Sequence, residues 1–456
     1  MLGRLAKKLS WLLGGALALA LAAYAVLVLA NLHDRSPSAE IAAIKTVHDS
    51  GSPFLSDRNS YLFVLGFAGA PDADPLALGM ERYQWMEQAG PEFDRSGDPL
   101  NEEYDFRADR SDAVAQVIAA CPESEAECFR ILDSEGQAVE QWLADERWLL
   151  DRYRSLIDMT EFKEAKALGT AAPLPAYGVI LEGQRLHIAD AWRSATQADA
   201  AAASTALDRD LLYWRMVLEN SGTLITKMIS TAAIVRHFKL GNLVLRRLPQ
   251  ENAADAIPRS WLQQFSIEER SMRRSLAGEW MFFDKGIKEN EDQPVPLASN
   301  TWDRVAWMLL QPFWQPQDLS NRQARMMLDL ADTFDVPYDE IPEAAGLAFD
   351  LQKSVYRPFS RLYNFTGDLF MAADYWRISD YAVRVSDLEG VRRAALLVAE
   401  LRAAGTGADE AATRMRVNDK VDPYTNEPFT WIADEEAIVF HGLDPRKERS
   451  RHKLIF

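Results

Sequence analysis

The sequence predicts a mainly α-helical protein with one transmembrane helix near its N-terminus and a small β-hairpin near its C-terminus. Three observations support this fold class. A long uncharged apolar segment lies close to the N-terminus, and segments with a helical period of 3.6 residues follow one another through most of the chain. No series of alternating, strand-like residues precedes residue 420.

The transmembrane prediction rests on Leu9 to His33, which contains 25 residues without a formal charge. About 20 apolar residues at a rise of 1.5 Å match the roughly 30 Å hydrocarbon core of a bilayer. Three basic residues precede the segment, so the positive-inside rule places the N-terminus in the cytoplasm and exports the remaining chain. A cleaved secretory signal is the alternative. An uncleaved anchor is favoured because the apolar run exceeds the 7–15 residues typical of such a signal.

Amphipathic helices dominate the exported part. Residues 59–67 are apolar and are predicted as a buried strand or a helix turn. The predicted helices beyond residue 111 are Ser134 to Met159, Pro173 to Ser194, Ala198 to Glu219, Thr223 to Phe238, Trp261 to Phe283, Thr301 to Leu310, Asn321 to Phe334, Ala344 to Tyr356, Gly367 to Trp376 and Val391 to Leu401. Short connections predict antiparallel packing. The hairpins resemble tetratricopeptide units, although the Trp, Gly and Pro punctuation of that repeat does not recur at 34 residues.

The C-terminal part differs from the rest. Residues 422–428 hold turn-forming residues, and the apolar stretches FTWI and AIVF beyond them predict a β-hairpin. Arg446 to Phe456 is a basic tail, predicted to be solvated and disordered, with a contact to anionic headgroups as the alternative. The predicted organisation is a cytoplasmic N-terminus (1–8), a transmembrane anchor (9–33), a membrane-proximal segment with loops (34–111), a helical-hairpin subdomain (112–248), a second helical subdomain (259–410), and the C-terminal hairpin with its basic tail (411–456).

Composition limits the classes of function. Hydrophobic residues make up 48% of the chain and aromatic residues 10%, which excludes a mainly disordered protein. The net charge of −18 disfavours binding to nucleic acid, because nucleic-acid recognition requires a basic surface.

The only cysteines are Cys121 and Cys128, and a disulfide between them would close a loop of eight residues. Such a bridge stabilises a fold by about 2–3 kcal/mol. An oxidising compartment favours pairing, with two buried thiols as the alternative.

The sequence contains no recognisable catalytic or metal-binding motif. His187 and His237 lie on predicted helices at spacings that do not suit zinc, and neither a nucleophile elbow nor a phosphate-binding loop occurs. Glu279 and Asp284 come closest to a pair of catalytic acids. Two acids five residues apart on one helix do not by themselves meet the geometry of a glycosidase. No cofactor and no metal are therefore expected.

Parts of the chain resemble a group of bacterial proteins. Residues 59–79 (NSYLFVLGFAGAPDADPLALG), the cysteine pair and residues 146–156 (ERWLLDRYRSL) are similar to uncharacterised gammaproteobacterial proteins anchored in the inner membrane. Residues 422–431 (DPYTNEPFTW) are similar to a D-P-[FY]-T-x-x-P-[LF] ending found in many exported bacterial proteins. The resemblance implies a bacterial, periplasmic protein, and it brings neither an activity nor catalytic residues.

Together these observations predict a single-pass inner-membrane protein whose helical bulk is periplasmic. The favoured hypothesis is a non-enzymatic binding or scaffold module of the cell envelope. The alternatives are a periplasmic hydrolase whose site is assembled from distant residues, and an assembly factor or chaperone for an exported protein. The expected partners are the inner membrane, through Leu9–His33, and an envelope protein. A deep cleft lined by acids with perturbed pKa values or by a Ser/His pair would indicate a hydrolase, whereas a concave, groove-like helical surface with exposed aromatic residues would indicate a scaffold.

Overall fold

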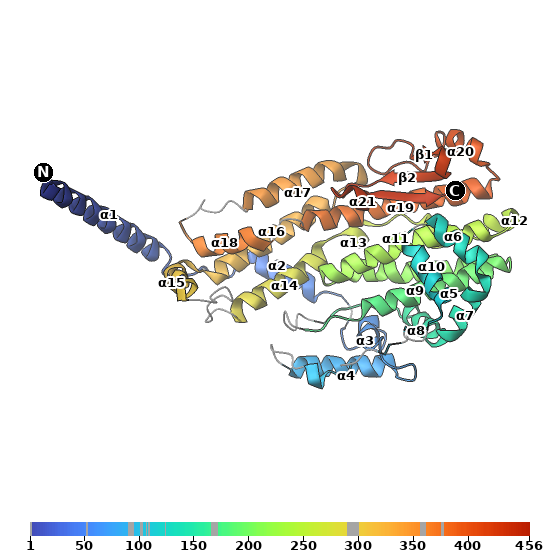
Figure 1. Cartoon of the computed structure of the whole chain (residues 1–456), viewed down its shortest axis with the longest axis horizontal. Coiled ribbons are helices and arrows are strands. Elements are labelled where there is room, and N and C mark those ends of the chain that lie inside the picture. Colours follow the sequence, from blue (N-terminus) through green and yellow to red (C-terminus); the bar gives the residue numbers. More distant parts are fainter. Residues whose placement is uncertain are drawn as a thin grey trace.

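The fold is an elongated helical body from which one long helix projects (Figure 1). The computed structural model describes residues 2–51, 53–89, 95–100, 104–105, 107, 110–123, 125–165, 172–289, 301–355, 362–374 and 378–456. Helix α1 (Leu2–Ala30) leaves one end of the body, and a three-stranded sheet lies toward the opposite end. The predicted mainly helical fold with an N-terminal apolar helix is thus confirmed.

The further α-helices are α2 (Ala39–Asp49), α3 (Ser60–Leu65), α4 (Pro75–Gln88), α5 (Asp112–Glu123), α6 (Glu125–Ser134), α7 (Gly136–Asp145), α8 (Arg147–Ile157), α9 (Tyr177–Thr196), α10 (Ala200–Asn220), α11 (Leu224–Arg247), α12 (Gln250–Ala253), α13 (Ile267–Arg270), α14 (Arg273–Glu289), α15 (Thr301–Leu310), α16 (Pro316–Phe334), α17 (Ile341–Val355), α18 (Phe365–Asp374), α19 (Ile378–Ala403), α20 (Ala408–Met415) and α21 (Lys447–Ser450). Short 3₁₀ turns are η1 (Arg95–Gly97), η2 (Arg259–Leu262), η3 (Gln311–Phe313), η4 (Tyr338–Glu340) and η5 (Ala433–Glu435).

Within the described residues, α1 is the one helix long and apolar enough to cross a membrane, with a span from Lys7 to Ala30. None of the most apolar part of this span is buried by the rest of the protein. The span ends three residues before His33 because Asn31 turns its amide side chain into the body. Its length and composition therefore fit a single-pass anchor.

The body is organised around α11, which packs against α9, α10 and α19, while α9 also packs against α10. Helix α19 is buried on nearly all sides, so it lacks the single apolar stripe of a surface helix. One apolar cluster runs from Ile41 to Phe456 and is continuous across the two predicted helical subdomains. The predicted subdomain boundaries and the tetratricopeptide-like arrangement remain predictions.

Two segments differ from the sequence prediction in a defined way. Residues 59–67 contain the short helix α3, so the helix-turn alternative is correct. The single helix predicted over 134–159 is interrupted at Glu146, where α7 ends and α8 begins. The Glu146 carboxylate is 3% exposed and receives two hydrogen bonds from Arg110, 2.5 and 3.0 Å long. This ion pair fixes the residue between α7 and α8 to Arg110, which precedes α5.

The C-terminal prediction needs a correction. The predicted hairpin is formed by β1 (Thr430–Ile432) and β2 (Ala437–His441), but the basic tail is not disordered, because β3 (Arg451–Ile455) pairs antiparallel with β2. The side chains of His452 and Leu454 are buried, whereas Arg451 and Lys453 lie toward solvent. The side chains of this segment therefore alternate between the core and solvent, as in a β-strand, although the segment is positively charged.

The sheet packs on α19 through close backbone contact. A side chain at Gly390 would place its Cβ 2.2 Å from the ring of Phe440 on β2, so only glycine allows this approach. The preceding 422–428 turn is held by Asp422, whose Oδ1 accepts the backbone N–H of Tyr424 at 2.8 Å. The Tyr424 hydroxyl donates to Asp387 of α19 at 2.7 Å. The conspicuous DPYT stretch thus attaches the sheet to the helical body.

Candidate functional site

The chain leaves α1 through a buried asparagine. Asn31 is 3% exposed, and its Nδ2 donates to the carbonyl oxygens of Leu27 (2.8 Å) and Leu362 (3.0 Å). Its Oδ1 accepts the backbone N–H of Asn364 at 2.6 Å, and the Gln315 side chain donates to the Asn31 carbonyl oxygen at 2.6 Å. The end of the apolar helix is therefore hydrogen-bonded to residues about 280 to 330 positions away in the sequence. The side-chain amide and the carbonyl oxygen of Asn31 thus have partners, as is usual for buried polar groups.

The next residues cap a helix of the body. Asp34 accepts the backbone N–H groups of Gln317 (2.6 Å) and Asp318 (3.0 Å) in the first turn of α16. A carboxylate at this position satisfies unpaired helix donors and interacts favourably with the helix dipole. Asn321 then donates to the Ser36 carbonyl at 2.9 Å and accepts the Ser38 N–H at 3.0 Å. Residues 31–38, called the junction below, are consequently a bonded strap rather than a free linker.

An arginine–tyrosine contact completes the junction. The Arg35 guanidinium lies 5.0 Å from the centre of the Tyr363 ring and 3.2 Å from an Asp318 carboxylate oxygen. The Tyr363 hydroxyl donates to the His33 carbonyl at 3.1 Å. Burial and the nearby carboxylates of Asp34 and Asp318 raise the pKa of Tyr363 above its ordinary value. The phenol therefore stays protonated and keeps its role as a donor.

An open cleft of about 1270 Å³ lies beside the junction, between the junction, α16, α17 and the residues that precede and begin α18. This volume is enough for a drug-sized ligand or a peptide segment. The described lining residues are Arg35, Ser36, Pro37, Ser38, Asp318, Asn321, Arg322, Arg325, Met326, Asp329, Leu351, Leu362, Tyr363 and Asp368.

Opposite charges balance in this cleft. Arg322 lies between Asp318, at 3.0 Å, and Asp368, whose carboxylate it also contacts. Arg325 pairs with Glu40 at 2.7 Å. Among the described residues, Nη2 of Arg322 and Oδ2 of Asp368 make no hydrogen bond although both atoms are buried. The exposed side chains of Arg325 and Asp329 nevertheless place charges of both signs on the cleft wall, which suits a ligand that carries both kinds of group.

The chemistry of an acyl-transfer enzyme is not assembled in the cleft. Neither a histidine nor a cysteine is present among its described lining residues, so its two serines have no neighbouring imidazole base.

Glu279 and Asp284 do not form a pair of catalytic acids. Glu279 accepts the backbone N–H of Leu224 at 2.8 Å and thereby caps α11, while burial raises the pKa of its carboxyl. Asp284 instead accepts hydrogen bonds from Ser320 at 2.6 Å and Lys288 at 2.7 Å. Each carboxyl group is engaged by a different element, and each role is structural.

A histidine–aspartate pair that resembles catalytic geometry is enclosed in the core. His237 Nδ1 and an Asp210 carboxylate oxygen are 2.7 Å apart, and the Trp261 indole N–H donates to His237 Nε2 at 2.8 Å. Because Nε2 accepts a hydrogen bond, the imidazole proton resides on Nδ1 and is donated to Asp210. Tyr153 donates to the other oxygen of Asp210. Asp210, His237 and Trp261 are fully buried, so this cluster is a satisfied polar network within the core.

His187 and the two cysteines are the remaining residues singled out in the sequence. No group of three or more His, Cys, Asp or Glu side chains within the described ranges is placed to hold a metal ion. His187 Nε2 lies 2.9 Å from the Ala206 carbonyl, and burial lowers the pKa of His187. Cys121 lies on α5 and Cys128 is buried on α6, but the side chain of Cys121 falls outside the described residues. The disulfide therefore remains a prediction.

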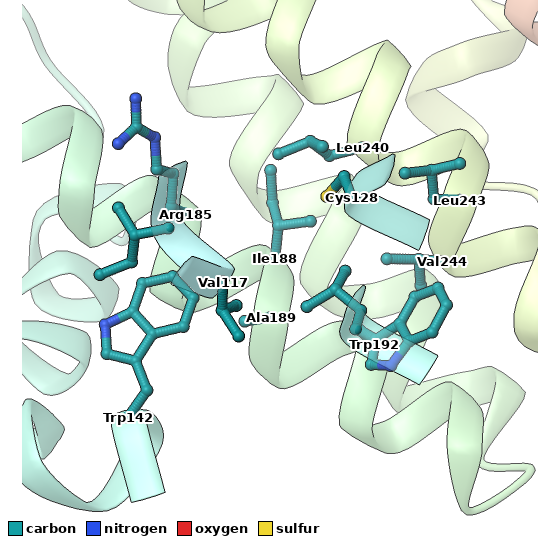
Figure 2. Close-up of a pocket in the computed structure, with 12 residues that line it drawn as sticks. Val117, Cys128, Trp142, Arg185, Ile188, Ala189, Trp192, Leu240, Leu243 and Val244 are labelled. Atoms are coloured by element: carbon teal, nitrogen blue, oxygen red, sulfur yellow. The ribbon is translucent and has the colours of Figure 1, made fainter. Parts of the chain in front are cut away.

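A second hollow lies between two groups of helices (Figure 2). Helices α5, α6 and α7 form one side of it, and α9 and α11 form the other. Trp142, Ile188, Trp192 and Leu243 are among its mainly apolar lining residues, and its volume is about 20 Å³. This volume would admit little more than one water molecule, and a mainly apolar lining offers such a water few partners. The hollow is an imperfection in packing and not a ligand site.

The stretches that carry the family resemblance have structural roles. Asn59 is fully buried, and its amide bonds both Phe54 and Lys163, which joins α3 to the chain after α8. Arg152 donates to the carbonyl oxygens of Phe67 (2.8 Å) and Gly69 (2.6 Å), and also to those of residues 70, 71 and 73. The two sequence stretches thus meet around one guanidinium group. Neither stretch by itself predicts that the Arg152 side chain bonds the backbone of the other.

The junction and its cleft were not identified from the sequence, because their residues come from segments that are far apart in the chain. Comparison with known proteins adds no further assignment: no family model, no curated protein and no solved structure matches this chain.

Proposed function

We propose that the protein is a membrane-tethered helical binding or scaffold protein of the bacterial cell envelope. In this proposal α1 spans the inner membrane, the N-terminus is cytoplasmic and the body is periplasmic. The observation that carries the proposal is the position of the cleft. It adjoins the bonded junction, so its lining is fixed at the end of the body from which the apolar helix emerges. A ligand in the cleft would be held next to the membrane.

The content of the cleft favours binding over hydrolysis. Its described lining balances three arginines against three aspartates, and Tyr363 adds an aromatic surface. A polypeptide segment offers matching backbone donors and acceptors together with charged side chains of either sign. We therefore favour a membrane-proximal segment of an envelope protein as the ligand. The tetratricopeptide-like arrangement and membership of the gammaproteobacterial group belong to the same proposal.

Site-specific photo-crosslinking tests the binding role. A photo-reactive residue at the exposed, cleft-lining Asp329 should form a discrete adduct with an envelope protein in native membranes. The same residue at Val417, which is 85% exposed on the short segment after α20, is the control site and should not form that adduct. Identical adducts from both sites, or none from Asp329, would contradict the proposal.

A charge reversal makes the test specific. Arg325→Glu breaks the exposed pair with Glu40 at the cleft and should reduce the adduct. The matched control is Arg414→Glu, which breaks the exposed pair with Glu410 (3.1 Å) on α20 and should leave the adduct unchanged.

Topology is tested separately with Val417→Cys. An impermeant maleimide should label this cysteine in cells whose outer membrane alone has been opened, and labelling only after lysis of the inner membrane would contradict the periplasmic assignment. A reporter fused at residue 456 is less suitable, because Phe456 is buried and its N–H donates to Glu436.

A further inference from the structure

Helix α15 (Thr301–Leu310) presents an apolar face that is largely exposed in the part of the chain that the structure describes. No residue of α15 is buried. Trp302, Val305 and Leu309 stand at positions i, i+3 and i+7, which places them on one face of the helix, and they are 82%, 43% and 54% exposed. Met308 flanks this face and is 70% exposed. A helical face of this kind requires an apolar environment, and the described part of the body supplies little of it.

The position of α15 identifies that environment. The Tyr24 hydroxyl of α1 donates to the Leu309 carbonyl at 3.1 Å, and the Tyr24 ring packs edge-on against Phe313, with 5.4 Å between ring centres. Figure 1 shows α15 at the point where α1 meets the body. Tyr24 precedes Ala30, the last residue of the span, by six residues, or about 9 Å along the helix. The C-terminal end of α15 therefore lies at a level within the membrane-spanning segment.

The depth can be placed against the bilayer. A span of 24 residues is about 36 Å long, so a 30 Å hydrocarbon core centred on it begins about 3 Å inside each end. Tyr24 then lies about 6 Å inside the hydrocarbon edge. Amphipathic helices that lie in a membrane interface bury their apolar face to about 5–10 Å, and tryptophan is enriched at this level. Asp303 and Arg304 fall on the other side of α15, where headgroups would solvate them.

We propose that α15 is an interfacial membrane helix, with Trp302, Leu309 and Met308 among the lipid chains of the leaflet next to the body. This inference rests on the proposed anchoring by α1. Lipid is the occupant of the apolar face because the space beside Tyr24 is filled by the bilayer whenever α1 spans it. The body then contacts the membrane at two places, and together with the bonded junction this fixes the tilt of the body and the direction in which the cleft opens.

Depth measurements with nitroxide labels test the proposal on the full-length protein in liposomes. Met308→Cys is the test site. The matched control is Val417→Cys, an apolar exposed position that follows α20, and α20 lies at the end of the body opposite α1 (Figure 1). Leu17→Cys, 63% exposed in the middle of the span, reports on α1 itself. Unsubstituted protein labelled in parallel gives the background from the native cysteines. The accessibility of each label to apolar oxygen and to a water-soluble nickel chelate is compared.

The expected result is preferential access of oxygen at Leu17 and Met308, and preferential access of nickel at Val417. If the label at Leu17 is preferentially accessible to oxygen while the label at Met308 has the same accessibility as that at Val417, the interfacial assignment of α15 is wrong and the anchoring by α1 stands. If Leu17 is also accessible to nickel, the anchoring itself is wrong. A Met308 label shielded from both reagents would show that protein covers this face in place of lipid, and it would overturn the proposal as well.

Discussion

Asp387→Asn offers a quantitative test of how the C-terminal sheet is attached. Asp387 is fully buried on α19, and its Oδ1 accepts both the Tyr424 hydroxyl (2.7 Å) and the Leu443 N–H (3.0 Å). Burial raises the pKa of this carboxyl from 3.8 to about 7. Asparagine keeps an acceptor oxygen of the same size and removes the ionisation. The substitution therefore isolates the cost of a buried charge at the point of attachment.

The sign follows from proton linkage. Because the pKa of Asp387 is higher in the folded state, the folded protein holds this proton more tightly. The resulting stability is present below pH 3.8 and is lost as the pH rises through about 7. With these two pKa values the loss between pH 5 and pH 8 is about 3 kcal/mol. Relative to wild type, the free energy of unfolding of Asp387→Asn should rise by this amount over the same interval.

Urea unfolding of the full-length protein in detergent micelles, followed by tryptophan fluorescence at both pH values, measures this difference. Burial lowers the pKa of His452 to about 4, but His452 titrates in both proteins and cancels in the comparison. Asp434→Asn, in the exposed turn between β1 and β2, is the control and should show no such gain. A difference between Asp387→Asn and wild type that is the same at pH 5 and pH 8 would show that ionisation of Asp387 does not destabilise the folded protein.

Three further substitutions or treatments have defined outcomes. Arg152→Lys should destabilise the protein by about 2–3 kcal/mol and expose residues 68–74 to proteolysis, because one ammonium cannot replace a guanidinium that donates to several carbonyl oxygens. Arg147→Lys on the exposed side of α8 is the control. Equal proteolysis of both variants would contradict this prediction. Trp261→Phe should cost about 1–3 kcal/mol in urea unfolding because His237 Nε2 loses its donor, whereas Trp302→Phe should be nearly neutral in detergent. If the two cysteines are bridged, alkylation of unreduced native protein should add no mass, and a modified thiol would disprove the bridge.

Local patterns predicted most elements but not how they are placed. The bounds of α15 match the predicted helix Thr301 to Leu310, because its apolar period is contained in ten consecutive residues. The same period would ordinarily predict a face turned into the core, whereas the structure leaves this face exposed next to α1. Periodicity specifies a face and is silent on whether protein or lipid covers it.

The missed features share a physical cause. The strand β3 was hidden because Arg451 and Lys453 dominate the composition, although His452 and Leu454 alternate with them and face inward. The junction was hidden because Asn31, Gln315 and Asn364 are individually ordinary polar residues. Their partners are specified by tertiary packing, which a scan of sequence neighbours does not detect.

The hydrogen bonds of the junction should make α1 and the body one rigid unit, and a distance measured across the junction tests this. Nitroxide labels at Leu29→Cys on α1 and Leu347→Cys on α17, which are 65% and 58% exposed, report the distance in lipid nanodiscs by pulsed electron resonance. We expect one narrow distance distribution that broadens when Asn31 and Gln315 are both replaced by alanine. A broad distribution in the protein with an intact junction would show that α1 is a flexible tether and that the junction does not fix the body relative to the membrane.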